Sequence, residues 1–423
     1  MQNPLRTDTY LGRTIKTEEL PVKTNILFNT IGSLTYQGCL WLMTVLVVAL
    51  SGNYSNAGTL AYAMALGNIF FTIAIYAMRT YQVSDVEGRY SQSNYLAFRI
   101  ITILLALVLC SIYALATGIP KDVIVPTLLF LLFKADEELA AVCYGSEQRF
   151  NRMDYAGISQ FLRGIAALLF FGLILRATAS LSLAILGMFM SCLAVTLLYD
   201  IPHMSAFGSI KPAINKSITV SLLRQCFPAV LATLLLTSVV SITRQYFGTL
   251  YGTEDLGKYA SVATPAVIIQ AMASFLYSPL IEPLSRTLSV EGKGAFAKHL
   301  VKVSLGLFAF LGILMLILGA FGNWFLTLIY GPSIAPFTYL LTLVLVITMQ
   351  AAFMMFLSDV LIILRSFKTV LVANLSSFLV TLAAMQVVIP RYGMDGINYV
   401  LIASYSAGLL VALIGIIRET RSH

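Results

Sequence analysis

Charge is scarce in this sequence. Of its 423 residues only 11% are charged, whereas 58% are hydrophobic, and the mean hydropathy is +0.86. Soluble globular proteins carry about 25% charged residues, so this chain has too little polar surface for a water-soluble fold. We therefore expect an all-α integral membrane protein, because long apolar runs are typical of spanning helices, whereas barrel strands alternate.

Cysteine and histidine are scarce as well. The five cysteines form no CxxC pair, and His203, His299 and His423 lie far apart in the sequence. A disulfide framework and a metal site are therefore not expected. The sequence also lacks a Walker A motif and a GxSxG nucleophile elbow. We expect a transporter rather than an ATPase or another enzyme, and we expect no cofactor.

Apolar runs of about 20 residues recur along the chain, and each is long enough to cross a bilayer. They predict twelve transmembrane helices, centred on residues 26–50, 57–78, 98–117, 122–144, 155–175, 180–199, 220–247, 258–281, 300–320, 336–364, 368–389 and 396–417.

The basic residues are distributed unevenly about these spans. Twenty of the 27 lysines and arginines fall on the side that holds both ends of the chain, four fall on the other side, and three lie within spans. Because short loops rich in Lys and Arg remain in the cytoplasm, both termini are expected there. The net charge of +8 is then a membrane-orientation signal. It does not indicate nucleic-acid binding.

The chain divides into two halves at a polar, proline-containing connection. We expect a cytoplasmic arm (1–24), an N-terminal six-helix bundle (25–203), a cytoplasmic linker (204–219), a C-terminal six-helix bundle (220–417) and a cytoplasmic tail (418–423). A weak internal echo supports a parallel pseudo-repeat, since Gly58 aligns with Gly257 and Ala61 with Ala260. Transporters built from such repeats bind substrate between the repeats.

The fourth span carries four charges in the segment Lys134–Glu138. Ionisable residues inside a membrane cost about 2.5–3.5 kcal/mol each and usually meet a partner or a wet cavity. Helical geometry allows Lys134 to pair with Glu137 or Glu138, while Asp136 points to the opposite side. Asp136 and Arg163 lie at equal depths of about 12 Å in adjacent antiparallel spans. We expect Arg163 to contact Asp136 or Glu137.

Two interpretations of these charges stay open. They brace spans four and five, or they line a water-filled cavity that receives an ionic substrate or a coupling ion. Arg244, near the outer end of span seven, either faces such a cavity or reaches the membrane interface. Arg79, at the foot of span two, is a candidate portal residue or a simple interfacial anchor. Polar uncharged positions that would line the cavity are Asn29, Gln37, Asn68 and Gln270.

Three stretches carry a resemblance to a known family. They are "AMRTYQVSDVEGRYSQSNYLAFR" from residue 77, "GSEQRFNRMDYAGISQFLRG" from residue 145 and "QYFGTLYGTEDLGKYASVATPAVIIQAMASFLYSPLI" from residue 245. Together with twelve spans, they resemble bacterial Wzx-like oligosaccharide flippases of the multidrug/oligosaccharidyl-lipid/polysaccharide exporter superfamily. The segments 81–85 and 148–154 match cytoplasmic motifs of that family, and Arg163 matches a family arginine.

The resemblance implies a fold and a function. The fold would be two six-helix bundles in a V that rocks between inward-open and outward-open states in the bacterial inner (plasma) membrane. The function would be the transfer of undecaprenyl-diphosphate-linked oligosaccharide repeat units to the outer leaflet, for capsule, O-antigen or teichoic acid. Lys134, Glu137, Glu138, Arg163 and Arg244 would supply the charged cavity, with H⁺ or Na⁺ as candidate coupling ions.

Partners and alternatives follow from the same resemblance. We expect a monomer that handles a lipid-linked glycan among membrane lipids, working beside a polysaccharide polymerase or glycosyltransferases. The alternative is a drug/cation antiporter of the same superfamily, although these typically carry an acidic residue in the first span and residues 25–50 hold none. A third candidate is a non-transporting scaffold, for which the intramembrane cations would be dispensable.

Overall fold

The structure is a computed structural model that describes residues 9–10, 13–14, 18–76, 78–85, 89–117 and 121–421. Two short strands, β1 (Thr9–Tyr10) and β2 (Arg13–Thr14), pair antiparallel, and nearly all other described residues are helical. The chain separates into two compact units, which comprise residues 1–52 with 66–230 (unit 1) and residues 53–65 with 231–423 (unit 2). Each unit is described by itself below.

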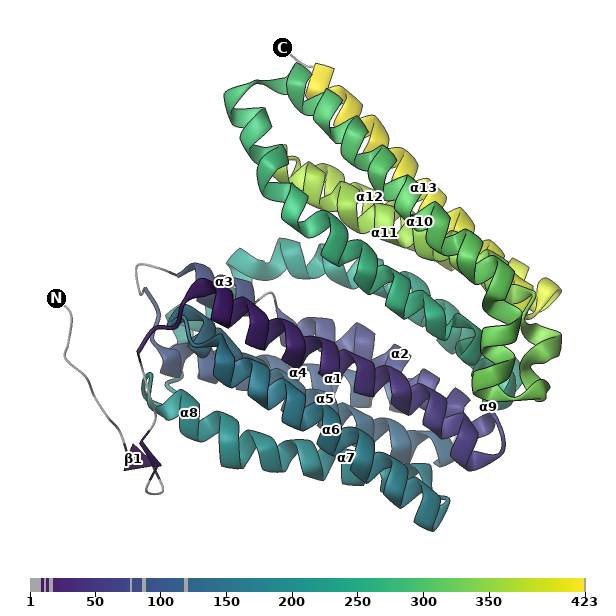
Figure 1. Cartoon of the computed structure of the whole chain (residues 1–423), viewed down its shortest axis with the longest axis horizontal. Coiled ribbons are helices and arrows are strands. Elements are labelled where there is room, and N and C mark those ends of the chain that lie inside the picture. Colours follow the sequence, from purple (N-terminus) through teal and green to yellow (C-terminus); the bar gives the residue numbers. More distant parts are fainter. Residues whose placement is uncertain are drawn as a thin grey trace. The chain divides into compact units, whose positions relative to one another are not determined.

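Unit 1 is a helical bundle in which α1, α5, α6 and α7 run side by side (Figure 1). Its helices are α1 (Val22–Ser51), the later part of α2 (Ser55–Ile75), α3 (Met78–Ser84), α4 (Gln92–Ala116), α5 (Lys121–Arg149), α6 (Met153–Thr178), α7 (Leu181–Val195), the π-helical turn η1 (Thr196–Asp200), α8 (Ile201–Ser205) and the first residues of α9 (Lys216–Val290). α1 packs along α6, and α5 contacts α4, α6 and α7.

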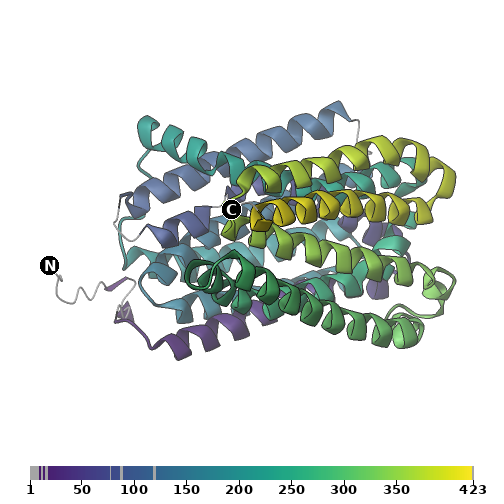
Figure 2. The ribbon, with the colours of Figure 1, turned by 90° about the horizontal axis from the view of Figure 1, so that it is seen from above.

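Unit 2 contains the start of α2 and the remaining helices. These are the greater part of α9, α10 (Lys293–Tyr330), the 3₁₀ turn η2 (Pro332–Phe337), α11 (Leu340–Ile363), α12 (Phe367–Tyr392) and α13 (Met394–Arg421). α12 and α13 pack along each other, as Figure 2 shows, and α11 packs against both. α10 leaves many large apolar side chains exposed, including Leu305, Leu316 and Leu328, as expected of a lipid-facing helix.

Ten helical stretches in the described part of the chain are long and apolar enough to cross a membrane, so the protein is a multi-pass membrane protein. One of them, Lys216–Pro265, includes the seventh predicted span and the start of the eighth. α5 is not among the ten, and it holds the charged segment Lys134–Glu138. The number twelve stays a prediction, as does the division at residues 204–219.

Three turns in unit 2 depend on glycine. Gly252, Gly292 and Gly331 have φ of 86°, 84° and 82° with ψ of 174°, −179° and 178°. That backbone region is accessible almost exclusively to glycine. Gly252 breaks α9 into two helical segments, and Gly292 and Gly331 flank α10. A glycine with the same backbone conformation therefore separates consecutive helical segments at all three turns.

The echo between Gly58 and Gly257 has a structural counterpart within unit 2. A Cβ atom added at Gly58 would lie 1.6 Å from the carbonyl oxygen of Thr253, and one added at Gly257 would lie 2.0 Å from that of Tyr54. The backbones of α2 and α9 therefore touch where the two matched glycines lie. Larger residues at either position would force the two helices apart.

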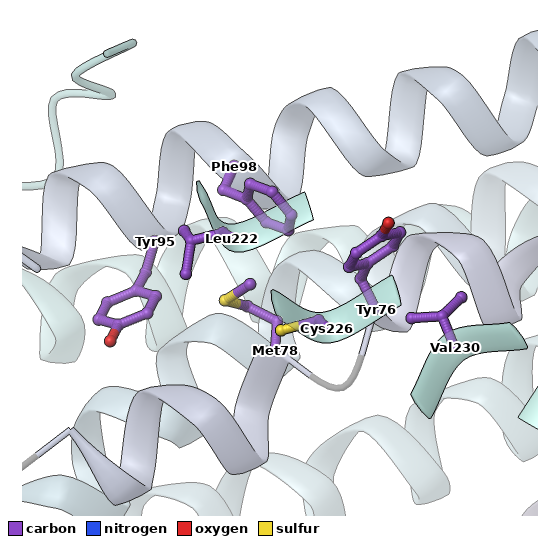
Figure 3. Packing of buried hydrophobic residues seen from close by; sticks show 7 residues of the cluster. All are labelled: Tyr76, Met78, Tyr95, Phe98, Leu222, Cys226 and Val230. Atoms are coloured by element: carbon purple, nitrogen blue, oxygen red, sulfur yellow. The ribbon is translucent and has the colours of Figure 1, made fainter. Parts of the chain in front are cut away.

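An apolar cluster in unit 1 joins segments from distant parts of the sequence. Figure 3 shows it around the end of α2, α3, α4 and the first turns of α9. Its buried members are Tyr76, Met78, Tyr95, Phe98, Leu222, Cys226 and Val230. The hydroxyl of Tyr76 also donates to the carbonyl of Leu223 over 3.1 Å. This cluster holds the beginning of α9 within unit 1.

Close packing of α1 on α6 positions the site described below. A Cβ atom added at Gly32 would lie 2.0 Å from the carbonyl oxygen of Gly157, and one added at Gly157 would lie 2.3 Å from that of Phe28. Small residues let helix backbones approach where lipid supplies no hydrophobic force between them. The approach brings Tyr36 of α1 to the charged segment of α5.

We expect Gly32→Ala to destabilise the protein and Gly38→Ala to leave it unchanged or slightly more stable. The first methyl would overlap the Gly157 carbonyl, which costs about 1–3 kcal/mol or more, whereas a Cβ at Gly38 meets nothing within 4 Å. Both glycines lie in α1, so helix propensity changes equally. Thermal unfolding of the purified protein in detergent measures the difference. Equal melting temperatures for the two variants would contradict the packing described here.

Candidate functional site

The charged segment of α5 meets a different partner on each of its faces. α5 lies inside unit 1, where α4, α6 and α7 contact it. The four charged side chains of residues 134–138 point in different directions around the helix. The three carboxylates among them bind cations or hydroxyls from α1, α4, α6 or α5 itself. The site is therefore a set of ion pairs distributed around one helix.

Asp136 pairs with Arg163 of α6 in the interior of unit 1. Their closest atoms, Oδ2 and Nη2, are 2.7 Å apart, and the side chains are 1% and 2% exposed. Arg163 Nη1 also donates to Thr196 Oγ1 over 2.5 Å and to the Cys192 carbonyl over 3.3 Å. Of the two contacts expected for Arg163, the structure shows the one with Asp136. The guanidinium is enclosed by α5, α6 and α7.

Asp200 approaches the same guanidinium from the π-helical turn. Its Oδ2 lies 3.9 Å from Arg163 Nη1, and its side chain is fully buried. Neither carboxylate oxygen of Asp200 has a hydrogen-bond partner among the described residues. The wider π turn carries both Thr196 and Asp200, and such turns occur often at functional sites. Arg163 is thus shared between two buried carboxylates.

Glu138 pairs with Arg99 of α4, which corrects one expectation. The third predicted span, residues 98–117, would place Arg99 at its cytoplasmic end. Instead, a capping box between Ser91 and Asn94 starts α4 at Gln92, so Arg99 lies two turns inside the helix. Its Nη1 is 2.7 Å from Glu138 Oε2, with exposed fractions of 1% and 8%.

Arg99 also closes the end of α2. Its Nη1 donates to the carbonyls of Ala74 and Ile75 over 2.6 and 3.0 Å. Helix ends leave carbonyls without intrahelical partners. α2 ends at Ile75, and the next residue, Tyr76, has a positive φ of 43°. One guanidinium therefore links α2, α4 and α5. Like Arg163, it contacts several helices of unit 1 at once.

Lys134 and Glu137 form the third pair, and it is the most open of the three. The Lys134 ammonium contacts Glu137 Oε2, and the side chains are 20% and 23% exposed. Glu137 Oε1 accepts a hydrogen bond of 3.1 Å from the Tyr36 hydroxyl of α1, and the Lys134 stem lies against Gly67 of α2. Lys134 is 13 residues from the start of α5, which is about 20 Å along the helix axis.

The other predicted cations are in different environments. Arg244 lies in unit 2, half-buried, and its Nε has no hydrogen-bond partner among the described residues. It lies within electrostatic range of the hydroxyls of Tyr259 and Tyr405. Arg79 in α3 donates to Gln148 Oε1 from both Nε and Nη2, over 3.3 and 3.2 Å. Arg79 thereby connects α3 to the end of α5.

Three of the predicted polar positions lie in unit 1 and one lies in unit 2. Asn29 on α1 is half-buried, whereas Gln37 on α1 and Asn68 on α2 are exposed. Gln270 is half-buried in unit 2. Among the described residues, none of the four has a hydrogen bond to the charged side chains of residues 134–138. Their roles stay predictions.

The segment 81–85 forms part of a compact joint next to α4. The carboxylate of Asp85 accepts hydrogen bonds from the backbone amides of Arg89 and Tyr90 and from the Tyr95 hydroxyl, at 2.9, 3.1 and 2.9 Å. Burial raises the pKa of Asp85, but these hydrogen bonds outweigh it, and the net pKa is below its ordinary value. The motif therefore fixes the connection from α3 to α4.

The segment 148–154 forms a second joint, between α5 and α6. Arg152 makes a two-point ion pair with Asp154, at 2.9 and 2.8 Å. Asn25 of α1 accepts from the Met153 amide over 2.8 Å and donates to the Asn151 carbonyl over 2.8 Å. Both segments quoted for the family resemblance thus hold helix ends of unit 1 in place.

Sequence reasoning missed several members of the site. Arg99 and Asp200 lie at the ends of apolar runs, where a charge is ordinarily interfacial, and only the extended helices bring them inside. Tyr36 looked like one apolar residue among many. The buried Glu147 of α5 has no hydrogen-bond partner for either oxygen among the described residues. A helical wheel of α5 extended to residue 149 would have flagged Glu147.

The arrangement gathers several opposite charges inside unit 1. Arg99, Lys134 and Arg163 face Asp136, Glu137, Glu138 and Asp200, so carboxylates exceed cations by one. Among the described residues, no three His, Cys, Asp or Glu side chains come close enough together to hold a metal ion. The pairs of Arg99 and Arg163 are buried, and Lys134 with Glu137 is the most exposed of the three.

Comparisons with known proteins agree with a transport fold. No protein-family model matches the chain. The capsular polysaccharide biosynthesis protein CapF of Staphylococcus aureus is 24% identical over 301 residues, which cover 70% of this chain and 74% of CapF.

Two solved structures extend the comparison over nearly the whole chain. The lipid II flippase MurJ, in an inward closed conformation, has a TM-score of 0.71 at 13% identity, over 93% of this chain and 89% of MurJ. An inward-facing multidrug resistance MATE family transporter of the MOP superfamily has a TM-score of 0.64 at 12% identity, over 93% and 97%. The chain therefore has the MOP-superfamily fold, and both of these structures are of transport proteins.

We expect the Asp136–Arg163 pair to show strong coupling in a double-mutant cycle. Asp136→Leu and Arg163→Met should each cost about 3–5 kcal/mol, because each leaves a buried charge without compensation. The double variant should recover part of that loss. Thermal unfolding in detergent measures all three, with Lys258→Met as the control, whose exposed pairs should be worth at most about 1 kcal/mol. A double variant as unstable as the sum of the singles would contradict the pairing.

Proposed function

We propose that this protein is a Wzx-like flippase that moves undecaprenyl-diphosphate-linked oligosaccharide repeat units from the inner to the outer leaflet by alternating access. The observation that carries the proposal is the Lys134–Glu137 ion pair, whose side chains are partly exposed in the middle of an apolar bundle. A diphosphate head cannot cross hydrocarbon without a hydrated, cationic passage. The fold shared with a lipid II flippase and the likeness to a capsule biosynthesis protein support the same function.

Within this proposal, the residues divide by accessibility. Lys134 contacts the diphosphate, and Glu137 with Tyr36 holds the ammonium in place and limits how tightly the head is bound. Arg244, half-buried with an unpartnered Nε in the described structure, is the second cation. Arg163 and Glu138 brace the helices, because their pairs are dry. The remaining candidates for the passage are Asn29, Gln37, Asn68 and Gln270, with Arg79 at the portal.

The proposal also includes location and partners. Twenty of the 27 basic residues lie on one side of the predicted spans, so both termini are cytoplasmic in the bacterial plasma membrane. The protein acts as a monomer and passes its product to a polysaccharide polymerase or to glycosyltransferases.

The second candidate, a drug/cation antiporter, has support from the MATE likeness. It is disfavoured because α1, Val22–Ser51, contains no carboxylate.

We expect Lys134→Met to lower the rate of lipid-linked oligosaccharide transfer about tenfold or more. A hydrogen bond to a charged group contributes about 1.5–3 kcal/mol, and each 1.4 kcal/mol is about tenfold. Lys134→Arg should keep most of the activity. The measurement is transfer between the leaflets of proteoliposomes. The charge-matched control is Arg176→Gln, which changes an exposed arginine in the last turn of α6. Unchanged transfer by Lys134→Met would remove the proposed role.

Transport would be coupled to H⁺ through Glu137. Protonation of Glu137 would release the Lys134 ammonium to bind the diphosphate, and deprotonation would recapture it. We expect a pH gradient to accelerate transfer by the native protein and to have little effect on Glu137→Gln, whose ammonium is always released. Gradients of H⁺ and of Na⁺ are imposed separately on the same proteoliposomes. Acceleration by Na⁺ alone would contradict H⁺ coupling and leave the flippase proposal standing.

A further inference from the structure

Unit 2 contains an open groove that the proposed function does not use. It has a volume of ≈ 800 Å³ and lies between the last turns of α9 and the first turns of α10. The two helices are joined at Gly292, whose φ of 84° and ψ of −179° allow the sharp reversal. The groove is therefore a fixed product of the helix reversal.

The end of the groove near the turn is polar and basic. Lys298 and Lys302 are four residues apart on α10 and so share one face with His299. Across the groove, Thr287 of α9 binds the His299 ring through a contact of 3.0 Å between Oγ1 and Nδ1. Glu291 is the acidic member of the lining. Two lysines against one carboxylate leave a net positive charge.

The end of the groove away from the turn is apolar. Tyr277 and Leu280 of α9 face Val303, Gly306 and Phe310 of α10. A Cβ atom at Gly306 would meet nothing within 4 Å, so this stretch of α10 leaves open space beside its backbone. Phe310 is eight residues beyond Lys302, which is about 12 Å along the helix. The lining of the groove thus changes from cationic to apolar along its length.

The surface beside the groove is lipid-facing. The neighbouring α10 residues Val301, Leu305 and Phe308 are 57%, 64% and 56% exposed, and α10 is long and apolar enough to span a membrane. A soluble anion would use only the basic end, and a polar peptide would find no partner at the apolar end. An amphiphile with a phosphate head and a hydrocarbon chain matches both ends.

We infer that the α9–α10 groove binds an anionic phospholipid of the membrane leaflet next to the positively charged loops. Its phosphate lies between Lys298 and Lys302, with His299 oriented by Thr287 beside it. One hydrocarbon chain follows Gly306 toward Phe310. Anionic leaflets attract such clusters of lysine, and the groove adds shape to that attraction. The inference does not depend on the proposed transport activity.

The test is native mass spectrometry of the full chain released from detergent with defined lipids. We expect retention of phosphatidylglycerol over phosphatidylcholine by about tenfold. Lys298→Gln with Lys302→Gln should abolish this preference. The control, Arg286→Gln with Lys293→Gln, removes the same charge from the same reversal outside the groove lining and should preserve it. Equal retention by both double variants would show general surface attraction and overturn the site.

A second variant tests the apolar end without changing charge. Gly306→Leu fills the open space, and we expect it to reduce phosphatidylglycerol retention about as strongly as the double lysine variant. Full retention by a folded Gly306→Leu protein would overturn the proposed chain path. Competition distinguishes other occupants. Displacement by inorganic phosphate alone, or stronger retention of a polyprenyl phosphate than of phosphatidylglycerol, would also overturn the assignment.

Discussion

The dominant constraint in unit 1 is the cost of charge inside an apolar bundle. The four charges of residues 134–138 would be too costly if they faced hydrocarbon. Each is instead met by a group from α1, α4, α6 or α5 itself, and the neighbouring helices are positioned accordingly. Arg163 binds α5, α6 and α7 together, and Arg99 binds α2, α4 and α5. The ion pairs that neutralise these charges therefore also fix the positions of the neighbouring helices.

The three ion pairs differ in what they leave accessible. Asp136–Arg163 and Glu138–Arg99 are dry, and a dry pair gives precise geometry while contributing little net stability. Lys134–Glu137 stays partly open and has the Tyr36 hydroxyl as a third member. A rigid, enclosed frame next to a labile pair is what a passage for a charged head group requires. In the proposed function, this frame would keep its shape while Lys134 and Glu137 exchange partners.

Composition predicted much of this structure, and local geometry determined the rest. Hydropathy located the helices, because the cost of exposed backbone in lipid leaves few alternatives. Equal depth predicted the approach of Asp136 and Arg163. Arg99 and Asp200 escaped prediction because a capping box and a π-helical turn moved the helix ends. The cations of the site differ in burial because each packs against residues that are distant in the sequence. Hydropathy contains no information about these partners.

The two compact units each include a piece of the opposite half of the sequence. Residues 53–65 belong with unit 2, and residues 216–230 belong with unit 1. During synthesis, the N-terminal helices emerge first and domains tend to fold in order of emergence. Here unit 1 includes the beginning of α9, which is synthesised late, and the start of α2 groups with helices that are synthesised after it. Neither half of the sequence therefore contains a complete unit, and each unit needs a segment from the other half to be complete.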